Sequence, residues 1–396
     1  MAKVPRRWSH VNDKRSAWKV FTTQLLQTAL VVSACGLSVS ANAQGAVPDG
    51  QPLRVAVVGL VHGHVAGFLP QLSQHPEIEL VGIEEPDHAL AEKYRTQFGL
   101  NSSLFYTDVN TMLEKVHPQA VLVYTAINEH RPVIEAAAAH GVSVMVEKPL
   151  TISLQDALAI RKTAKEHGIH VLTNYETTWY PSNHAAYEYL QEGKLGTLRK
   201  VVVRDGHQGP REIGVGPEFL NWLTSPEKNG AGALYDFGCY GVDLMTWMMH
   251  GATPVSVTAE TQTDKPAIYP HVDDDSAIVL RYPGTQAVVL GSWDWSFAVK
   301  NLEVYGTKGT AFTDAADKIR VRLSEADVEP PLTTAPPLEG PQSGSIAYLV
   351  AVMRGQLQSK GDLTALDTNV VVMQILDAAR TSARTGKTIP LQPLPQ

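Results

Sequence analysis

The sequence predicts an α/β protein of two domains: a doubly wound parallel sheet over residues 50–172, then an α+β domain with a large, mainly antiparallel open sheet over residues 173–396. Two observations predict this fold. In the first part, buried apolar runs alternate with helical patterns, as right-handed crossovers between parallel strands require. In the second part, strand-like runs follow one another with few helices between them, as in antiparallel sheets.

The first part alternates strands and helices in a regular order. Residues 53–59 form a β-branched run that ends in glycine, and a helical pattern follows through Val65, Phe68, Leu69 and Leu72. Residues 79–83, 120–124 and 142–146 are further apolar strands, with helices over 88–98 and 131–140. The last strand delivers Glu147, Lys148 and Pro149 to the carboxyl edge of the sheet, where open α/β folds bind ligands.

The second part contains strands at residues 200–204, 276–280, 286–290 and 302–305. Residues 282–285, Tyr-Pro-Gly-Thr, form the hairpin turn between two of them. A late helix over residues 370–383 ends before Gly386, and we expect it to pack back onto one of the domains.

Residues 1–43 have the pattern of an export signal. Six basic residues precede an apolar stretch over 25–39, and Ala-Asn-Ala at 41–43 precedes Gln44. The apolar stretch is too short and too often interrupted to span a membrane. Two alternatives remain: residues 32–35 resemble a lipoprotein box that would make Cys35 a lipid anchor, and Arg6-Arg7 suggests a twin-arginine signal. We expect a periplasmic or otherwise exported protein, or alternatively a membrane-anchored lipoprotein.

Charge and cysteine content exclude some classes of protein. Removal of residues 1–43 leaves 27 Lys and Arg against 39 Asp and Glu, so no basic face argues for binding to nucleic acid. The same cleavage leaves Cys239 as the one cysteine, which rules out an internal disulfide.

Lys148 is the first candidate catalytic residue. A lysine at the edge of a sheet can lose water, lower its pKa toward neutrality and exchange protons with a substrate hydroxyl. The alternative is a surface lysine that precedes a loop proline. Asp236, Tyr240 and Asp243 have the spacing i, i+4, i+7 and would form a polar stripe on an apolar helix, and such a stripe usually lines a cleft. A buried structural role is the alternative for Tyr240.

These motifs resemble the family of glucose-fructose oxidoreductase, inositol dehydrogenase and related sugar dehydrogenases (Gfo/Idh/MocA). The resemblance rests on Glu147-Lys148-Pro149, on residues 236–243 and on Val-Tyr-Gly-Thr-Lys-Gly at 304–309, and it covers nearly all of the chain after residue 43. It implies a Rossmann domain that holds NAD or NADP and a sheet domain that presents a sugar or polyol. It also implies that Lys148 works in proton transfer with Tyr240 and Asp236. We expect a homo-oligomer formed through the C-terminal sheet.

The cofactor loop departs from the family pattern. Gly59 keeps the first glycine of G-x-G-x-x-G, but Val61 and His64 stand where the other two are expected. Since the second glycine normally lets the backbone approach the pyrophosphate, Val61 argues for weaker binding. His62 or His64, beside Gly63, could donate to a phosphate; a capping or exposed histidine is the alternative.

The remaining cofactor residues come from the ends of the later strands. Glu85 stands where a family acid bonds the adenosine ribose, and its charge would repel a 2′-phosphate, so NAD is favoured and NADP remains possible. The competing interpretation makes Glu84-Glu85 a solvated turn. The resemblance adds the cofactor contacts of Thr125, His130, Glu147, Lys148 and Pro149.

Candidate substrate contacts in the second domain are Trp179, His207, Arg211 and Asp243, with Trp222 as a further aromatic residue; loop aromatics more often simply pack. Thr177 and Thr178 replace an arginine frequent in relatives, which argues against an anionic substrate. Residues 271–275, His-Val-Asp-Asp-Asp, read as a solvated turn at the start of a strand, so we predict no metal site.

The sequence therefore predicts an exported NAD(P)-dependent oxidoreductase that acts on a sugar or polyol hydroxyl. Free NAD is scarce outside the cytoplasm, so the cofactor should stay bound through the catalytic cycle. Two alternatives stay open: a redox-neutral sugar epimerase or glycoside-cleaving enzyme, and a non-catalytic sugar-binding relative with a degenerate loop.

Overall fold

The structure, a computed structural model, describes residues 50–395 of the 396-residue chain. The predictions for the leader, including the processing of Cys35 and cleavage after Ala43, lie outside the described residues. Within residues 50–395, no helix has both the length and the apolar character needed to span a bilayer.

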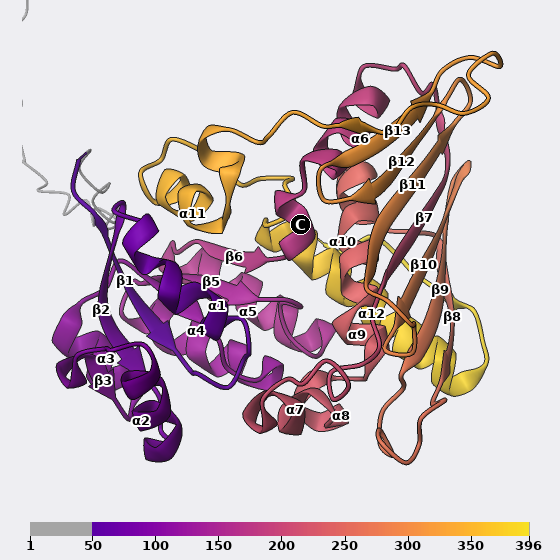
Figure 1. The fold of residues 1–396 in the computed structure, drawn as a ribbon. Helices are drawn as coiled ribbons and strands as arrows, with labels where there is room; N and C mark the ends of the chain where they lie inside the picture. Colours follow the sequence, from indigo (N-terminus) through magenta and orange to yellow (C-terminus); the bar gives the residue numbers. More distant parts are fainter. Residues whose placement is uncertain (1–49, 396) are drawn as a thin grey trace, which may run out of the picture. The chain divides into compact units, whose positions relative to one another are not determined.

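The first domain is a parallel sheet of six strands in the order β3-β2-β1-β4-β5-β6 (Figure 1). Its strands are β1 (Leu53–Val58), β2 (Ile78–Glu84), β3 (Phe105–Tyr106), β4 (Ala120–Val123), β5 (Ser143–Glu147) and β6 (Val171–Asn174). The four strands expected from the apolar runs are confirmed, whereas the short β3 and the edge strand β6 were not predicted. The strand order reverses between β1 and β4, so the loop after β1 opens onto the crevice where doubly wound sheets bind ligands.

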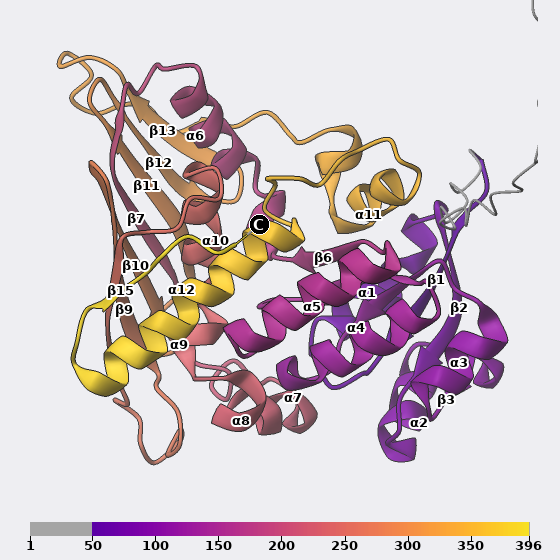
Figure 2. The same cartoon turned by 180° about the vertical axis from the view of Figure 1, so that it is seen from behind.

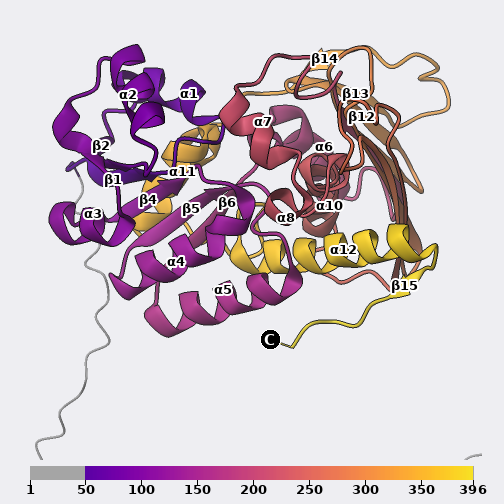
Figure 3. The ribbon, with the colours of Figure 1, turned by 90° about the horizontal axis from the view of Figure 1, so that it is seen from below.

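Helices cover both faces of this sheet. On one face lie α3 (Val109–Val116), α4 (His130–Ala139) and α5 (Leu154–His167), which bury alternate residues of β4 and β5. The other face is covered by α1 (Val65–Phe68), α2 (His88–Gln97) and α11 (Ser345–Met353), which returns from the C-terminal part of the chain (Figure 3). The expected boundary at residue 172 therefore leaves out α11, which belongs to the core of the first domain.

The first helix is shorter than the sequence pattern suggests. Only Val65–Phe68 is α-helical, and the chain continues as a 3₁₀ turn, η1 (Leu69–Gln74). Pro70 explains the change, because it has no backbone N–H to continue the helical hydrogen bonding.

The second domain is a sheet of nine strands in the order β14-β13-β12-β11-β7-β10-β9-β8-β15. Its strands are β7 (Leu198–Gly206), β8 (Ser256–Gln262), β9 (Asp275–Tyr282), β10 (Thr285–Ser292), β11 (Val299–Gly306), β12 (Thr310–Ala315), β13 (Lys318–Arg322), β14 (Thr333–Thr334) and β15 (Ile389–Pro390). The pair β7–β10 is parallel and the other described pairs are antiparallel, which confirms a mainly antiparallel sheet. The hairpin at residues 282–285 is also confirmed, with Tyr282 paired to Thr285 and Gly284 at φ 77°.

Helices α6 (Pro181–Gln191), α10 (Gly238–Met248) and α12 (Leu366–Thr385) pack on one face of this sheet. Helix α12 is the predicted late helix, and it begins four residues earlier than expected. It contacts β8, α10 and α5, so it packs against elements of both domains (Figure 2). These contacts fix the two sheets around the cavity described next.

Candidate active site

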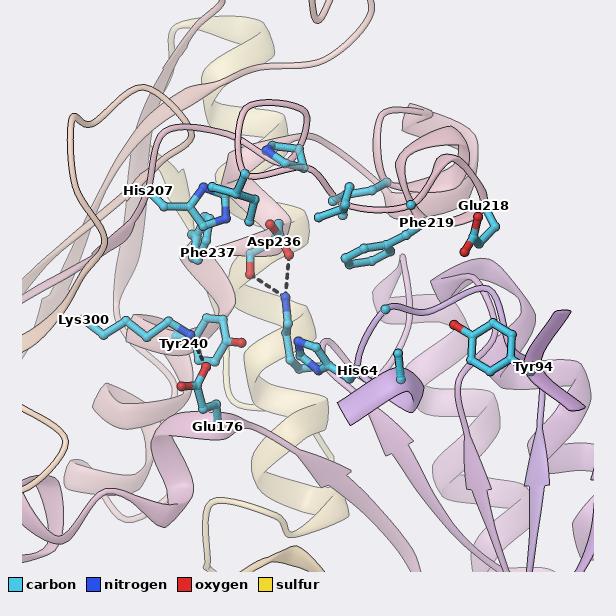
Figure 4. A pocket seen from close by; sticks show the side chains of 18 of the residues that line it. His64, Tyr94, Glu176, His207, Glu218, Phe219, Asp236, Phe237, Tyr240 and Lys300 are labelled. Carbon is cyan, nitrogen blue, oxygen red and sulfur yellow. Dashed lines mark hydrogen bonds and ion pairs between the residues drawn. The ribbon is translucent and has the colours of Figure 1, made fainter. Parts of the chain in front are cut away.

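A cavity of about 630 Å³ lies between the loop after β1 and the second domain (Figure 4). This volume is in the range of small-molecule sites. Every Lys, Asp and Glu side chain that lines it belongs to an ion pair within the lining: Lys148 with Asp236, Lys300 with Glu176, and Lys93 with Glu218.

Lys148 and Asp236 form a buried ion pair at the cavity wall. Lys148 follows β5 directly, and Asp236 is the last residue of α9 (Ala233–Asp236). The Lys148 ammonium donates to the Asp236 carboxylate and, at 3.0 Å, to its backbone carbonyl. Trp293 Nε1 donates to the other carboxylate oxygen at 2.9 Å. The carboxylate is therefore held on both oxygens and keeps the ammonium in place.

The expected lowering of the Lys148 pKa is not what the structure gives. Burial acts to lower the pKa of Lys148, but the adjacent Asp236 carboxylate prevails and the pKa lies above its ordinary value. Burial alone would raise the pKa of Asp236, yet Lys148 holds it below the ordinary value. The lysine is thus an ammonium ion and proton donor in this state, because its counterion is a residue that lies 88 positions away in the sequence.

Tyr240 lies beside this pair, whereas Asp243 does not. Tyr240 lines the cavity from α10, with Lys148 Nζ 5.0 Å from its ring centre, and burial raises its pKa, so the phenol keeps its proton. The three residues do not share one helix, because the helix is interrupted at Phe237, between α9 and α10, but Asp236 and Tyr240 both line the cavity. Asp243 is fully buried away from the cavity lining, with neither oxygen hydrogen-bonded, and burial raises its pKa. The structure thus does not bring Asp243, a predicted substrate contact, to the cavity.

Of the other predicted substrate contacts, His207 lines the cavity. Its Nδ1 accepts the Gly209 backbone N–H at 2.8 Å, and burial lowers its pKa, so the ring is neutral. Trp179 instead donates to Asn174 at 3.0 Å and packs against Tyr348, outside the lining. Arg211 is exposed on a loop. Its backbone N–H donates to the Tyr269 hydroxyl at 3.1 Å, and this hydrogen bond attaches the loop to the domain. Both side chains were predicted to contact substrate, and both lie elsewhere.

The loop after β1 passes close to the neighbouring strand. Gly59 has φ 79°, and a Cβ there would lie 2.6 Å from Thr125 Cγ2, so this position requires glycine. Thr125 itself donates to the Ala126 carbonyl at 3.1 Å. Gly63 and His64 line the cavity.

His62 is buried rather than exposed. Its ring lies 4.7 Å from that of Phe219 and 5.3 Å from that of Trp222. Its Nδ1 faces the backbone N–H of His64 at 3.3 Å, which places the proton on Nε2, and Nε2 has no partner. Burial keeps the pKa of His62 well below its ordinary value. The loop therefore contains a buried neutral donor without an acceptor.

Glu85 supports the loop after β1 and does not lie in a solvated turn. Its carboxylate accepts the backbone N–H groups of Leu60 at 2.8 Å and of Asp87 at 2.9 Å, and burial raises its pKa. Two amide donors leave further lone pairs on a carboxylate for a ribose hydroxyl. Glu84 beside it is also largely buried, and burial together with Glu85 raises its pKa to about 7.

The last predicted cofactor residues lie at and just after the end of β5 and at the start of α4. Glu147 accepts from Asn174 at 3.2 Å and lies 3.0 Å from His64 Nδ1. His130 is fully buried, donates to the Leu150 carbonyl at 3.1 Å, and has its pKa lowered to about 4 by burial. Pro149 follows Lys148 through a cis peptide bond.

Two groups of possible metal ligands bear on the prediction that the protein has no metal site. Asp273 and Asp274 are mostly buried, and they accept backbone N–H groups at the start of α9 and at residues 264–265. They are therefore internal caps, and the solvated turn expected there is wrong. His62, His64 and Glu147 have ligand atoms within 4.8 Å of one another. His62 Nδ1 faces the backbone N–H of His64, and His64 Nδ1 lies 3.0 Å from a Glu147 carboxylate oxygen, so the absence of a metal site stays a prediction.

Sequence reasoning missed Glu176, Lys300 and Phe219, which all line the cavity. Glu176 follows β6 and Lys300 lies in β11, and no motif surrounds either residue. A polar residue just after a parallel strand was the available signal for Glu176, but β6 was not predicted.

Comparison with known proteins gives a consistent result. Residues 53–175 match the family described as "Oxidoreductase family, NAD-binding Rossmann fold", and residues 184–312 match the "GFO/IDH/MocA C-terminal domain". Together these matches cover more than half of the chain. The chain is 24% identical over 250 residues to trans-1,2-dihydrobenzene-1,2-diol dehydrogenase of Mus musculus (62% of this chain, 69% of that protein). It is 25% identical over 235 residues to 1,5-anhydro-D-fructose reductase of Ensifer adhaerens (59% and 67%).

Solved structures share the fold. Aldose-aldose oxidoreductase from Caulobacter crescentus, complexed with glycerol, superposes with a TM-score of 0.72 at 22% identity and covers 86% of this chain and 100% of its own. An inositol dehydrogenase homolog from Azotobacter vinelandii, complexed with NAD⁺, has a TM-score of 0.71 at 19% identity, with 86% and 98% covered.

Proposed function

Because the chain belongs to the Gfo/Idh/MocA family of NAD-binding oxidoreductases, we propose that it oxidises and reduces a hydroxyl carbon of a neutral sugar or polyol with NAD that stays bound. The substrate class is supported by the relatives, whose names specify an anhydrosugar, an aldose and an inositol. The observation that carries the proposal is the buried Lys148–Asp236 pair beside Tyr240 in the cavity between the domains.

The described residues fit a dinucleotide. Gly59 keeps the loop against Thr125, and the unpartnered Nε2–H of His62 is a buried donor of the kind that an anionic phosphate oxygen would satisfy. Glu85 keeps lone pairs for a ribose hydroxyl. When bound, NAD supplies a hydride acceptor and donor for the substrate carbon.

The protein supplies the proton path. We assign the proton acceptor to Lys148 and Asp236 together: as the ammonium passes one proton to the carboxylate, it takes the proton of the substrate hydroxyl. Lys148 ends this step as an ammonium ion and Asp236 as a carboxylic acid, so the protons balance. In the reverse direction Lys148 donates to the carbonyl oxygen. Tyr240, whose phenol stays protonated, orients the same oxygen by hydrogen bonding.

Contacts of α7 (Pro217–Leu223) support retention of the cofactor. Glu218 pairs with Lys93 of α2 at 2.8 Å, and Trp222 Nε1 donates to the Val61 carbonyl at 3.2 Å. Phe219 covers the loop so closely that a Cβ on Gly63 would lie 3.0 Å from its ring. Helix α7 thus closes over the loop that would hold the pyrophosphate, and release would require these contacts to break. Retention suits an exported enzyme, and we propose export through residues 1–43, with anchoring through Cys35 as the alternative.

The test is to add neutral aldoses and polyols to the purified protein and to follow absorbance of the bound cofactor at the nicotinamide band. Reduction by at least one of them in the wild type, and none in Lys148→Ala, is the expected result. A protein that contains cofactor but whose cofactor no sugar or polyol reduces contradicts the proposal.

Cofactor retention also favours a redox-neutral reaction, in which hydride leaves and returns to one substrate. Exchange of a carbon-bound deuterium label within the substrate, without net reduction of cofactor, would identify that reaction. The third candidate is a sugar-binding protein without catalysis, for which Val61 is the sequence argument and against which the intact Lys148–Asp236 pair argues.

A further inference from the structure

A second ammonium–carboxylate pair occupies the sheet-domain side of the cavity. Lys300 Nζ, from β11, lies 2.5 Å from Glu176 Oε2, and Glu176 Oε1 accepts the Tyr180 hydroxyl at 2.6 Å. Figure 4 shows Lys300 and Glu176 meeting beside Tyr240, on the side away from Glu218 and Phe219. No role in cofactor binding or proton transfer accounts for this pair.

A contribution to folding stability does not explain the Lys300–Glu176 pair. The Glu176 side chain is 51% exposed and the Lys300 side chain 22%, and ion pairs of this kind contribute little to folding. Both side chains instead line the cavity. In the strand register, Lys300 is opposite Asp205, but the ion pair that Lys300 makes is with Glu176.

Tyr240 lies between the two pairs. Its ring centre is 5.0 Å from the Lys148 ammonium and 4.4 Å from the Lys300 ammonium. Tyr240 thus links the Lys148–Asp236 pair to the end of the cavity that Lys300 and Glu176 form. That end of the cavity offers an ammonium donor next to a carboxylate acceptor, which matches hydroxyl groups that both donate and accept.

We propose that Lys300 and Glu176 form a second anchoring subsite for the hydroxyls of a neutral substrate, and that Glu176 is the residue that excludes sugar acids. This inference rests on the proposed function and names its substrate class. Glu176 neutralises Lys300 and would repel a substrate carboxylate. Removing its charge while keeping its shape leaves Lys300 free to pair with an acid.

The experiment measures dissociation constants by calorimetry for three matched pairs: D-glucose and D-glucuronate, D-galactose and D-galacturonate, D-mannose and D-mannuronate. The wild type is expected to prefer the neutral member. Glu176→Gln should shift the ratio of dissociation constants at least tenfold toward the acid in at least one pair. Lys300→Met should weaken binding of the neutral sugar about tenfold. The double variant should lose the increased affinity for the sugar acid that Glu176→Gln alone gains.

Lys318→Met is the matched control, because Lys318 pairs with Asp317 on β13 outside the cavity, and it should change no ratio. An unchanged ratio in Glu176→Gln for all three pairs overturns the inference, as does unchanged neutral binding in Lys300→Met. If the ratio shifts but no sugar reduces the bound cofactor, the subsite stands and the proposed function fails. A protein that binds none of the six sugars overturns the inference, and the proposed function is then decided by the reduction experiment with polyols.

Discussion

Replacing Asp236 by asparagine tests the central ion pair while keeping the shape of the side chain. Lys148 is 5% exposed, so Asp236→Asn leaves an ammonium ion buried without its counterion. Breaking a buried pair in this way costs about 3–5 kcal/mol. Lys148 can also avoid being a buried charge by losing its proton. Deprotonating a lysine costs about 1.4 kcal/mol for each pH unit below its ordinary pKa, so at pH 7 the free-energy cost is at most about 5 kcal/mol.

The pH dependence follows from the direction of the shifts. In the wild type the pKa of Lys148 is raised, so its contribution is complete below the unfolded pKa and is lost as pH rises above it. In the variant the Asp236 charge no longer opposes burial, which lowers the pKa of Lys148, so the variant gains stability as pH rises. The difference in unfolding free energy should therefore fall from about 3–5 kcal/mol at pH 7 to about 1 kcal/mol at pH 9.5.

The assay is urea unfolding of both proteins at pH 7 and pH 9.5, followed by tryptophan fluorescence. Asp314→Asn is the matched control, since Asp314 pairs with Arg320 on the surface of β12 and β13. It should cost less than about 1 kcal/mol at both pH values. A loss in Asp236→Asn that equals the control, or that stays constant between the two pH values, would refute the assignment of a buried charge pair.

Three further outcomes are expected. Lys148→Ala should lower turnover at least a hundredfold while bound nucleotide per chain stays unchanged, because the proton path acts in the transition state; activity within about tenfold of wild type would remove Lys148 from the mechanism. Glu85→Gln, which keeps an acceptor for the Leu60 N–H, should narrow the preference for NAD over NADP in titrations of stripped protein, whereas a native preference for NADP would mean that another residue reads the ribose. Burial lowers the pKa of His130 to about 4, so the unfolded chain binds more protons between pH 4 and 6.5, and stability falls as the pH is lowered from 6.5 to 4. His130→Asn should remove up to about 3 kcal/mol of that loss in unfolding experiments, and an unchanged slope of stability against pH would contradict the burial of a neutral ring.

Much of the fold could be predicted because its signals are local. Apolar runs, turn residues and helical periods identified four strands of the first sheet and the hairpin at Pro283-Gly284. The edge strand β6 and the return of α11 to the first domain were missed, since both depend on contacts with distant parts of the chain. Pro70 was a local signal for the shortened first helix, and the apolar period through Leu72 concealed it.

The candidate active site likewise contains residues that sequence motifs located and residues that they did not. Motifs located Lys148, Asp236 and Tyr240, which the structure brings together. The direction of the Lys148 pKa depends on a counterion from another domain. Periodicity alone placed Asp243 in a cleft, whereas the residue is fully buried outside the cavity lining. Lys300 and Glu176 carry no motif. They come from β11 and from the turn after β6, and only the tertiary fold brings them together with Tyr240.

The most direct test of a retained cofactor is to purify the protein without adding nucleotide, denature it, and quantify by mass spectrometry the nicotinamide nucleotide released per chain. The account predicts close to one NAD per chain, held beneath α7. A protein that is empty, and that also fails to bind added NAD or NADP, would contradict it.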